Sequence, residues 1–278
     1  MIIARTILET KNYLKSHCTK TIGFVPTMGA LHNGHIELIK RAVNENEISV
    51  CSVFVNPTQF NNPDDLKKYP RTLEADLLLL EAAGCDLVFA PSAEEMYSQN
   101  PILKLDFGDL EHIMEGEFRP GHFNGVGIVV SKLFHIVKPT KAYFGQKDIQ
   151  QVAVINRLIN DLSFDLEMVV CETIRENDGL AMSSRNRRLS DDARKLAPKI
   201  YESLLLGKKL LQEGNSPDNT FSKIKEYYDN IEEIELEYYK ITSAESLAEL
   251  SNFDPKNKTA LILAAYLDGV RLIDNLIF

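Results

Sequence analysis

Residues 21–35, TIGFVPTMGALHNGH, contain an apolar run, a turn and two histidines that are three positions apart. The apolar run is typical of a buried strand, and the segment after the turn places Ile36, Ile39 and Val43 on one helical face. The stretch therefore predicts a strand, a tight turn and a helix that begins near His35. The first N–H groups of a helix have no partners within it and lie at the positive end of its dipole, so this arrangement suits phosphate binding.

Short apolar runs and helical periodicity continue to alternate over the first two-thirds of the chain. We expect strands at 21–27, 48–56, 85–91 and 166–174, a strand running into a loop at 141–148, and helices at 35–47, 72–84, 123–139 and 149–162. Strands that alternate with helices predict βαβ units and a Rossmann-like, doubly wound parallel sheet covered on both faces. Ligands of such sheets bind at the carboxyl ends of the strands, where the histidine turn is expected.

The character of the sequence changes after about Glu176. Segments 189–214 and 216–230 are charged and helical, and segments 234–243 and 259–276 are typical of strands in a small mixed sheet. We therefore expect a larger α/β domain over 1–176 and a smaller α+β domain over 177–278.

Charge and cysteine content narrow the classes of partner. The chain has 31 Lys and Arg against 40 Asp and Glu, a net charge of −9, which disfavours a nucleic-acid partner and requires a local basic pocket for any anionic ligand. The four cysteines form no CxxC pair, and Cys51 and Cys85 lie in apolar runs, so we expect free thiols and a reducing cytoplasm. We expect no signal peptide and no membrane association, because no segment reaches the roughly 20 apolar residues of a membrane span.

The histidine pair favours the binding of a phosphate group. Residues at i and i+3 share a helical face, so His32 and His35 can face one phosphate, and Gly34 lets a base or ribose lie against the backbone. Each imidazole can donate a hydrogen bond to oxygens that gain charge during phosphoryl transfer, an effect worth about 3–4 kcal/mol per donor. The alternative is a helix cap and one surface histidine, which the strand–turn–helix setting disfavours.

Two further segments could bind anions. Ser183, Ser184 and Arg185 offer hydroxyls, backbone N–H groups and a guanidinium, although the same residues could simply begin a helix with solvated arginines. Lys147 follows a predicted strand end, where an ammonium can reach a phosphate, although many such lysines are only solvated. Three anion-binding segments on an acidic protein indicate a triphosphate ligand.

The HxGH spacing resembles that of the nucleotidyltransferase superfamily that shares HIGH-like and KMSKS-like signatures with class I aminoacyl-tRNA synthetases. Within it, the chain resembles the pantothenate synthetase (pantoate–β-alanine ligase) family through PTMGALHNGH, FVNPTQF, YPRTLEADLLLLEAAGCDLVFAP, RPGHFNGVGIVVSKLFHIVKP, AYFGQKDIQQ, RENDGLAMSSRN and RLIDN, in this order. The resemblance covers about residues 20–276. It implies that ATP activates pantoate as pantoyl adenylate, which β-alanine converts to pantothenate with release of AMP. It also implies a homodimer.

The resemblance implies catalytic roles for His32, His35 and Lys147, with His35 usually assigned as a proton donor; we favour charge stabilisation, which dominates phosphoryl transfer. It implies that Gln59 and Gln151 bind pantoate and β-alanine, and that Mg²⁺ joins the ATP phosphates, with Asp148 near the metal or the ribose. The implied ATP site consists of Met28, Gly29, Ala30, Leu31, His32, Asn33, Gly34, His35, Gly145, Gln146, Lys147, Asp148, Ile174, Met182, Ser183, Ser184 and Arg185. The first domain would hold ATP and pantoate, and the second would cover the active site.

The sequence also fits other classes of protein. Another HxGH nucleotidyltransferase would need extra basic residues for a phosphorylated substrate, and a tRNA-synthetase-like module would need a basic face and a longer chain. A regulator that only binds nucleotide has no need of a complete transition-state clamp. The base that deprotonates β-alanine is not evident, and the glycine-containing segment 111–125 could be a mobile lid or a surface turn.

Overall fold

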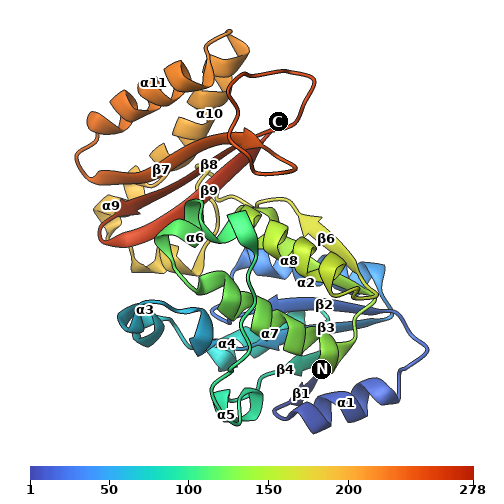
Figure 1. The fold of residues 1–278 in the computed structure, drawn as a ribbon. Coiled ribbons are helices and arrows are strands. Elements are labelled where there is room, and N and C mark those ends of the chain that lie inside the picture. Colours follow the sequence, from blue (N-terminus) through green and yellow to red (C-terminus); the bar gives the residue numbers. More distant parts are fainter. The chain divides into compact units, whose positions relative to one another are not determined.

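The computed structural model describes residues 1–278, and the chain divides into two compact units (Figure 1). Unit 1 comprises Met1–Gly145 and Gln150–Glu172, and unit 2 comprises Gln146–Ile149 and Thr173–Phe278. Residues 146–149, which include Lys147, therefore belong to unit 2 although the residues before and after them belong to unit 1. None of the helices is both long enough and apolar enough to cross a lipid bilayer.

Unit 1 is built on a six-stranded parallel sheet. Across the sheet, the strands are β1 (Ile2–Ala4), β4 (Leu87–Phe89), β3 (Ile48–Val53), β2 (Ile22–Thr27), β5 (Lys141–Gly145) and β6 (Glu167–Cys171). From β2 the chain adds β3 and β4 in one direction, and then β5 and β6 in the other. The prediction of a doubly wound, Rossmann-like sheet is confirmed, and the order reverses between β2 and β5, where ligands of such sheets bind.

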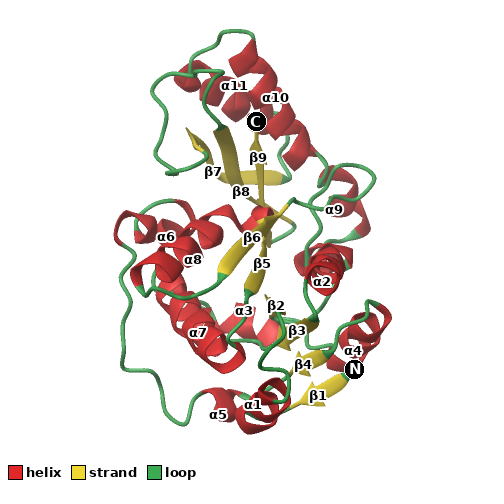
Figure 2. Ribbon diagram, turned by 90° about the vertical axis from the view of Figure 1, so that its right-hand side faces the viewer, coloured by secondary structure: helices red, strands yellow, loops and turns green.

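Helices cover both faces of this sheet, with α2 and α4 on one side and α7 and α8 on the other (Figure 2). The helices of this part of the chain are α1 (Ile7–Lys15), α2 (Asn33–Glu45), α3 (Pro63–Lys68), α4 (Leu73–Ala82), α5 (Ala93–Met96), α6 (Met114–Phe118), α7 (His122–Val137) and α8 (Ile149–Asp161), with 3-10 turns η1 (Pro57–Gln59) and η2 (Gly108–Glu111). Strand alternation explains the two faces, because Phe24 contacts Phe134 of α7 whereas Val25 packs in the same cluster as Ile39 of α2.

Unit 2 is the smaller α+β unit that the sequence predicts, but its sheet is antiparallel throughout and not mixed as expected. Its antiparallel sheet has the order β7 (Ile234–Ser243), β8 (Thr259–Leu267) and β9 (Val270–Ile277), and its helical elements are η3 (Gln146–Asp148), η4 (Ser184–Arg188), α9 (Asp191–Leu196), α10 (Lys199–Gln212) and α11 (Pro217–Asp229). The helical segment expected over 189–214 is two helices, because Pro198, which has no backbone N–H, stands at their junction. Helices α10 and α11 pack against the sheet.

The contact between α10 and β7 leaves no room for a side chain at Gly207. A Cβ atom there would lie 2.0 Å from the Tyr239 hydroxyl, which is buried without a hydrogen-bond partner. We expect Gly207→Ala to lower the free energy of unfolding by about 1–3 kcal/mol through overpacking, although alanine normally favours a helix. Tyr239→Phe removes the clashing oxygen, so Gly207→Ala should cost much less in that background. Urea unfolding of the single and double variants measures this coupling, and equal losses in both backgrounds would contradict the packing account.

Candidate active site

The histidine pair lies at the turn between β2 and α2. The helix begins at Asn33, two residues before the predicted start, and His32 is its N-cap. The ring centroids of His32 and His35 are 4.0 Å apart, so the structure brings the two imidazoles together as predicted. The His32 backbone N–H donates to His35 Nδ1 at 3.4 Å, and a neutral His35 ring with this tautomer carries its proton on Nε2. Both rings are half-buried, and Nε2 of His35 can serve as a hydrogen-bond donor.

A buried carboxylate holds this turn in place. Asp76 of α4 is 2% exposed, and its two oxygens accept hydrogen bonds from the backbone N–H groups of Ala30 at 2.9 Å and Leu31 at 2.8 Å. The Thr72 hydroxyl also donates to this carboxylate, at 3.2 Å. Ala30 has a φ of +50°, a conformation that costs free energy for a non-glycine residue and persists where surrounding contacts impose it. Asp76 therefore fixes the backbone that leads into His32.

Gln59 lies in η1, directly after β3, and is 9% exposed. The Asn56 amide donates to Gln59 Oε1 at 3.1 Å and to the Gly125 carbonyl at 3.2 Å, while Gln59 Nε2 lies 3.0 Å from Met28 Sδ. The Tyr97 hydroxyl donates to Asn56 Oδ1 at 2.9 Å, and burial raises the pKa of Tyr97, which keeps this donor protonated. These contacts orient the Gln59 amide so that its NH₂ group faces the histidine turn.

Gly125 is required where α7 approaches η1. A Cβ atom at this position would lie 2.3 Å from the Thr58 carbonyl oxygen, so only glycine permits the Asn56–Gly125 contact. On the same helix, His122 Nδ1 lies 2.8 Å from the Gln59 carbonyl oxygen. The first turn of α7 therefore also supports Gln59.

The segment 111–125 is packed against α8. Gln150 accepts a hydrogen bond from the Glu115 N–H at 2.9 Å and donates to the carbonyls of Leu110 and Ile113, both at 2.8 Å. Residues 114–116 are buried, so the surface-turn interpretation is wrong for this part of the segment. Gln151, the second predicted substrate ligand, follows Gln150 in the first turn of α8 and is half-buried.

The remaining predicted residues lie after β5 and around η4. Gly145 ends β5 in unit 1, whereas Gln146, half-buried Lys147 and exposed Asp148 form η3 of unit 2. In unit 2, the Met182 N–H donates to the Ile174 carbonyl at 2.9 Å, and Ser183 caps η4 by accepting from the Arg185 N–H at 3.2 Å. Both η3 and η4 pack beside β9. The structure thus groups the predicted residues into a histidine–glutamine set in unit 1 and a lysine–serine–arginine set in unit 2.

Sequence reasoning missed two residues that hold this geometry, Asp76 and Asn56. Asp76 has a signal in retrospect, since it lies one helical turn before the fully buried Leu80 in the largely apolar segment LEADLLLL, on the face that the helix buries. Asn56 lies in a segment that the resemblance already used, but its contact with Gly125 spans 69 positions and has no local signal.

A doubly wound parallel sheet with paired imidazoles at its switch point defines a Rossmann-like α/β protein of the HxGH nucleotidyltransferase type. The family model "Pantoate-beta-alanine ligase" matches residues 2–277. The chain belongs to the pantoate–β-alanine ligase family, as the resemblance indicated.

Individual relatives agree with this assignment. The pantothenate synthetase of Cytophaga hutchinsonii is 49% identical over 280 residues, which cover 100% of this chain and 99% of the relative. The solved pantothenate synthetase of Thermus thermophilus has a TM-score of 0.93 and 42% identity, with 99% of each chain covered. The pantoate–β-alanine ligase of Francisella tularensis, solved in complex with β-γ ATP and β-alanine, has a TM-score of 0.82 and 37% identity, with 100% of this chain and 97% of that chain covered.

The role of Asp76 can be tested by measuring the free energy of unfolding of Asp76 variants. Asp76→Ala leaves two turn N–H groups without their acceptor, each at a cost of about 1–3 kcal/mol, so we expect the free energy of unfolding to fall by about 2–6 kcal/mol. Asp76→Asn keeps one acceptor oxygen and should lose less. Glu74→Ala, at an exposed position of the same helix, is the matched control and should stay within about 0.5 kcal/mol of the parent. Urea unfolding decides the matter: an Asp76→Ala variant as stable as the control would remove the anchoring role.

Proposed function

We propose that this chain condenses pantoate with β-alanine at the expense of ATP, forming pantothenate, AMP and pyrophosphate through pantoyl adenylate. The observation that carries this proposal is the adjacent His32–His35 pair at the switch point of a chain that matches the ligase family from residue 2 to residue 277. The solved relative complexed with β-γ ATP and β-alanine supports the choice of these two substrates.

In the first step, a carboxylate oxygen of pantoate attacks the α-phosphorus of ATP, and the bond to the pyrophosphate oxygen breaks. Negative charge grows on the phosphate oxygens and on the leaving group. His32 and His35 are the proposed hydrogen-bond donors to these oxygens, with His35 donating from Nε2. Donors that are already oriented stabilise such charge without reorganisation during the reaction.

In the second step, the β-alanine amine attacks the acyl carbon of the adenylate, and AMP leaves. The ammonium group of β-alanine has a pKa near 10 and is mostly protonated at neutral pH, so it must lose a proton before its nitrogen can attack.

We propose that the ATP phosphates also contact Lys147, Ser183, Ser184 and Arg185. Residues 28–35 would line the nucleotide, and Asp148 would reach the ribose or Mg²⁺. No group of three or more histidine, cysteine or acidic side chains is arranged to hold a metal ion. Mg²⁺ would therefore take most of its ligands from the phosphates and from water, as Mg²⁺ commonly does.

Gln59 and Gln151 are the proposed ligands of pantoate and β-alanine. A neutral amide can bind a hydroxyl or a carboxylate without adding the positive charge that would hold the nucleophile back. The Asn56 contact at Gln59 Oε1 leaves the Gln59 NH₂ group directed toward Met28, on the histidine turn. This orientation supports a carboxylate position beside the imidazoles.

The proposed reaction is tested by AMP formation with purified protein, ATP and Mg²⁺. We expect AMP to accumulate only when pantoate and β-alanine are both present, with equimolar pantothenate. Transfer of a nucleotide to a phosphorylated acceptor, with no pantothenate formed, would instead support another HxGH nucleotidyltransferase.

The role of His35 can be separated into hydrogen bonding and proton transfer. We expect His35→Ala to slow pantothenate formation at least about 10²-fold, and His35→Gln, whose amide still donates, to recover about tenfold of that loss. His135→Ala, at an exposed histidine on α7, is the control and should keep the parent rate. Steady-state kinetics with folded variants measures these effects. Near-parent activity of His35→Ala would exclude His35 from the mechanism, and a glutamine variant no better than alanine would favour proton transfer.

We also propose that the protein is a cytoplasmic homodimer that binds no nucleic acid, in keeping with its family, its reduced cysteines and its net charge of −9. Light scattering at micromolar concentration should give twice the mass of the chain. A single species with the mass of one chain would refute the dimer.

A further inference from the structure

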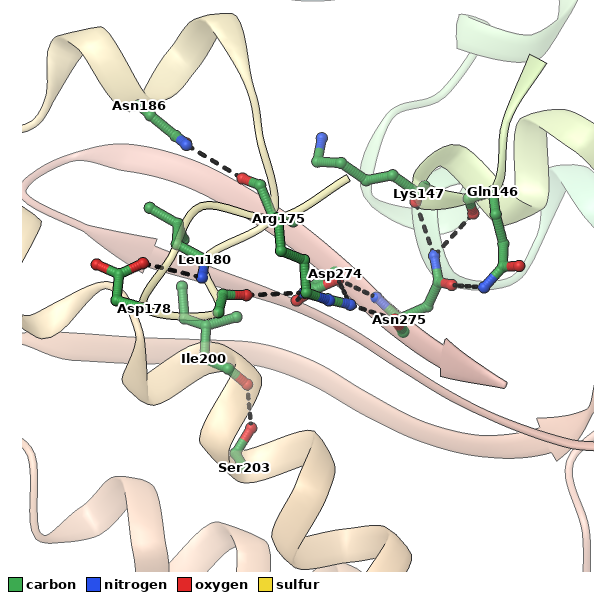
Figure 3. A network of polar contacts seen from close by, with 12 residues as sticks. Gln146, Lys147, Arg175, Asp178, Leu180, Asn186, Ile200, Ser203, Asp274 and Asn275 are labelled. Carbon is green, nitrogen blue, oxygen red and sulfur yellow. Dashed lines mark hydrogen bonds and ion pairs between the residues drawn. The ribbon is translucent and has the colours of Figure 1, made fainter. Parts of the chain in front are cut away.

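Two consecutive residues of β9, Asp274 and Asn275, are buried polar groups that the proposed mechanism does not use. They are 2% and 1% exposed, and they belong to the RLIDN segment near the carboxyl end of the chain. Buried polar groups cost free energy unless they are hydrogen-bonded, so their partners show what they hold. Figure 3 shows these partners, all of which lie in unit 2.

Asn275 binds the turn that carries Lys147. Its Nδ2 atom donates to the carbonyl oxygens of Gln146 at 2.9 Å and Lys147 at 2.8 Å. Its Oδ1 atom accepts from the Gln146 side-chain amide at 3.4 Å. Both hydrogens of one NH₂ group are therefore used on two adjacent backbone carbonyls.

These two carbonyls belong to the peptide groups on either side of the Lys147 Cα atom. Peptide groups are planar and rigid, so the orientation of the two planes defines φ and ψ at the residue between them. Holding both carbonyls therefore fixes the direction in which the Lys147 side chain leaves the backbone. Figure 3 shows this side chain extending away from the amide that binds its carbonyl.

Asp274 holds the other element of the same unit that is proposed to bind phosphate. Its carboxylate accepts from Arg175 Nη1 at 2.6 Å and Nη2 at 3.0 Å, and Nη2 also donates to the Asn275 carbonyl at 3.1 Å. Arg175 pairs with Ala181 at the base of the loop that leads to Ser183, and its guanidinium stacks on the Tyr201 ring at 3.7 Å. One strand thus binds both the lysine turn and the serine–arginine loop.

We propose that Asn275 is a positioning residue for Lys147, whose ammonium it aims by fixing the two flanking peptide groups. This inference rests on the proposed role of Lys147 at the ATP phosphates. It predicts that adenylate formation depends on the amide of Asn275, although Asn275 need not touch any substrate.

The test is a double-mutant cycle read out by pantoate-dependent ATP–pyrophosphate exchange, in which β-alanine is omitted. Asn275→Asp is nearly isosteric but sets a carboxylate oxygen against two carbonyl oxygens, so the turn must move. A displacement of about 1 Å at a reacting group can cost about 10²-fold, and we expect kcat for exchange to fall about 10- to 100-fold with little change in KM for pantoate. Asn230→Asp, which changes an exposed amide that also donates to a backbone carbonyl, is the matched control and should keep the parent rate.

The same substitution is then made in a Lys147→Ala background. If Asn275 acts through Lys147, Asn275→Asp should change the rate of that background by less than about twofold. An equal loss in both backgrounds would show a general structural effect and overturn the proposal, as would a parent rate for Asn275→Asp. If Asn275→Asp does not fold, as judged by circular dichroism, Asn275→Ser replaces it; its hydroxyl can serve only one carbonyl, and the same outcomes apply.

The single variants separate this proposal from the proposed function. A parent protein without pantoate-dependent exchange would contradict the proposed adenylate step, independently of Asn275. Exchange in the parent together with a parent rate for Lys147→Ala would leave the reaction intact and overturn both the role of Lys147 and its positioning by Asn275.

Discussion

The hydrogen bonds from the Ala30 and Leu31 N–H groups to the buried Asp76 carboxylate determine the geometry of the site in unit 1. They hold a turn in which Ala30, a non-glycine residue, has a positive φ, and Leu31 is followed directly by His32, the N-cap that carries the first imidazole. The two imidazoles meet because α2 begins directly after this turn. The Gln59 amide, which Asn56 orients, is directed toward Met28 of the same turn, so the turn that Asp76 holds lies beside both imidazoles and the proposed carboxylate ligand.

In unit 2 the hydrogen-bonding roles are reversed, because a side-chain donor rather than a side-chain acceptor holds the turn. In unit 1 a carboxylate satisfies two consecutive N–H donors, whereas in unit 2 the amide of Asn275 satisfies two consecutive carbonyl acceptors. In each unit, a side chain that is distant in sequence binds two adjacent peptide groups next to a residue proposed to act on ATP. Such contacts are specific because both partners are buried, and an unpaired buried polar group costs about 1–3 kcal/mol.

The sequence predicts the features that depend on local pattern. Alternating apolar runs and helical periods predict the parallel sheet, and the HxGH spacing predicts that the two imidazoles meet. The short strand β1 and the packing of 113–116 against Gln150 were not predicted, because each depends on neighbours far along the chain. The helix break at Pro198 has a local cause that the expected single helix overlooked. The contacts of Asp76 and Asn275 span 45 and 128 positions, and no local period indicates which buried acid or amide will serve a given turn. The ordered motifs predict the family and therefore the chemistry, whereas the residues that hold the site emerge only from the folded chain.

The central claim is that the histidine turn supports attack of the pantoate carboxylate on the α-phosphate of ATP before any amine takes part. The most direct measurement is the exchange of labelled pyrophosphate into ATP by the parent protein with Mg²⁺ and pantoate, in the absence of β-alanine. The account predicts exchange that requires pantoate and stops when pyrophosphatase hydrolyses the pyrophosphate. No exchange under conditions in which the same preparation forms pantothenate from all three substrates would contradict a freely reversible adenylate step before the amine binds.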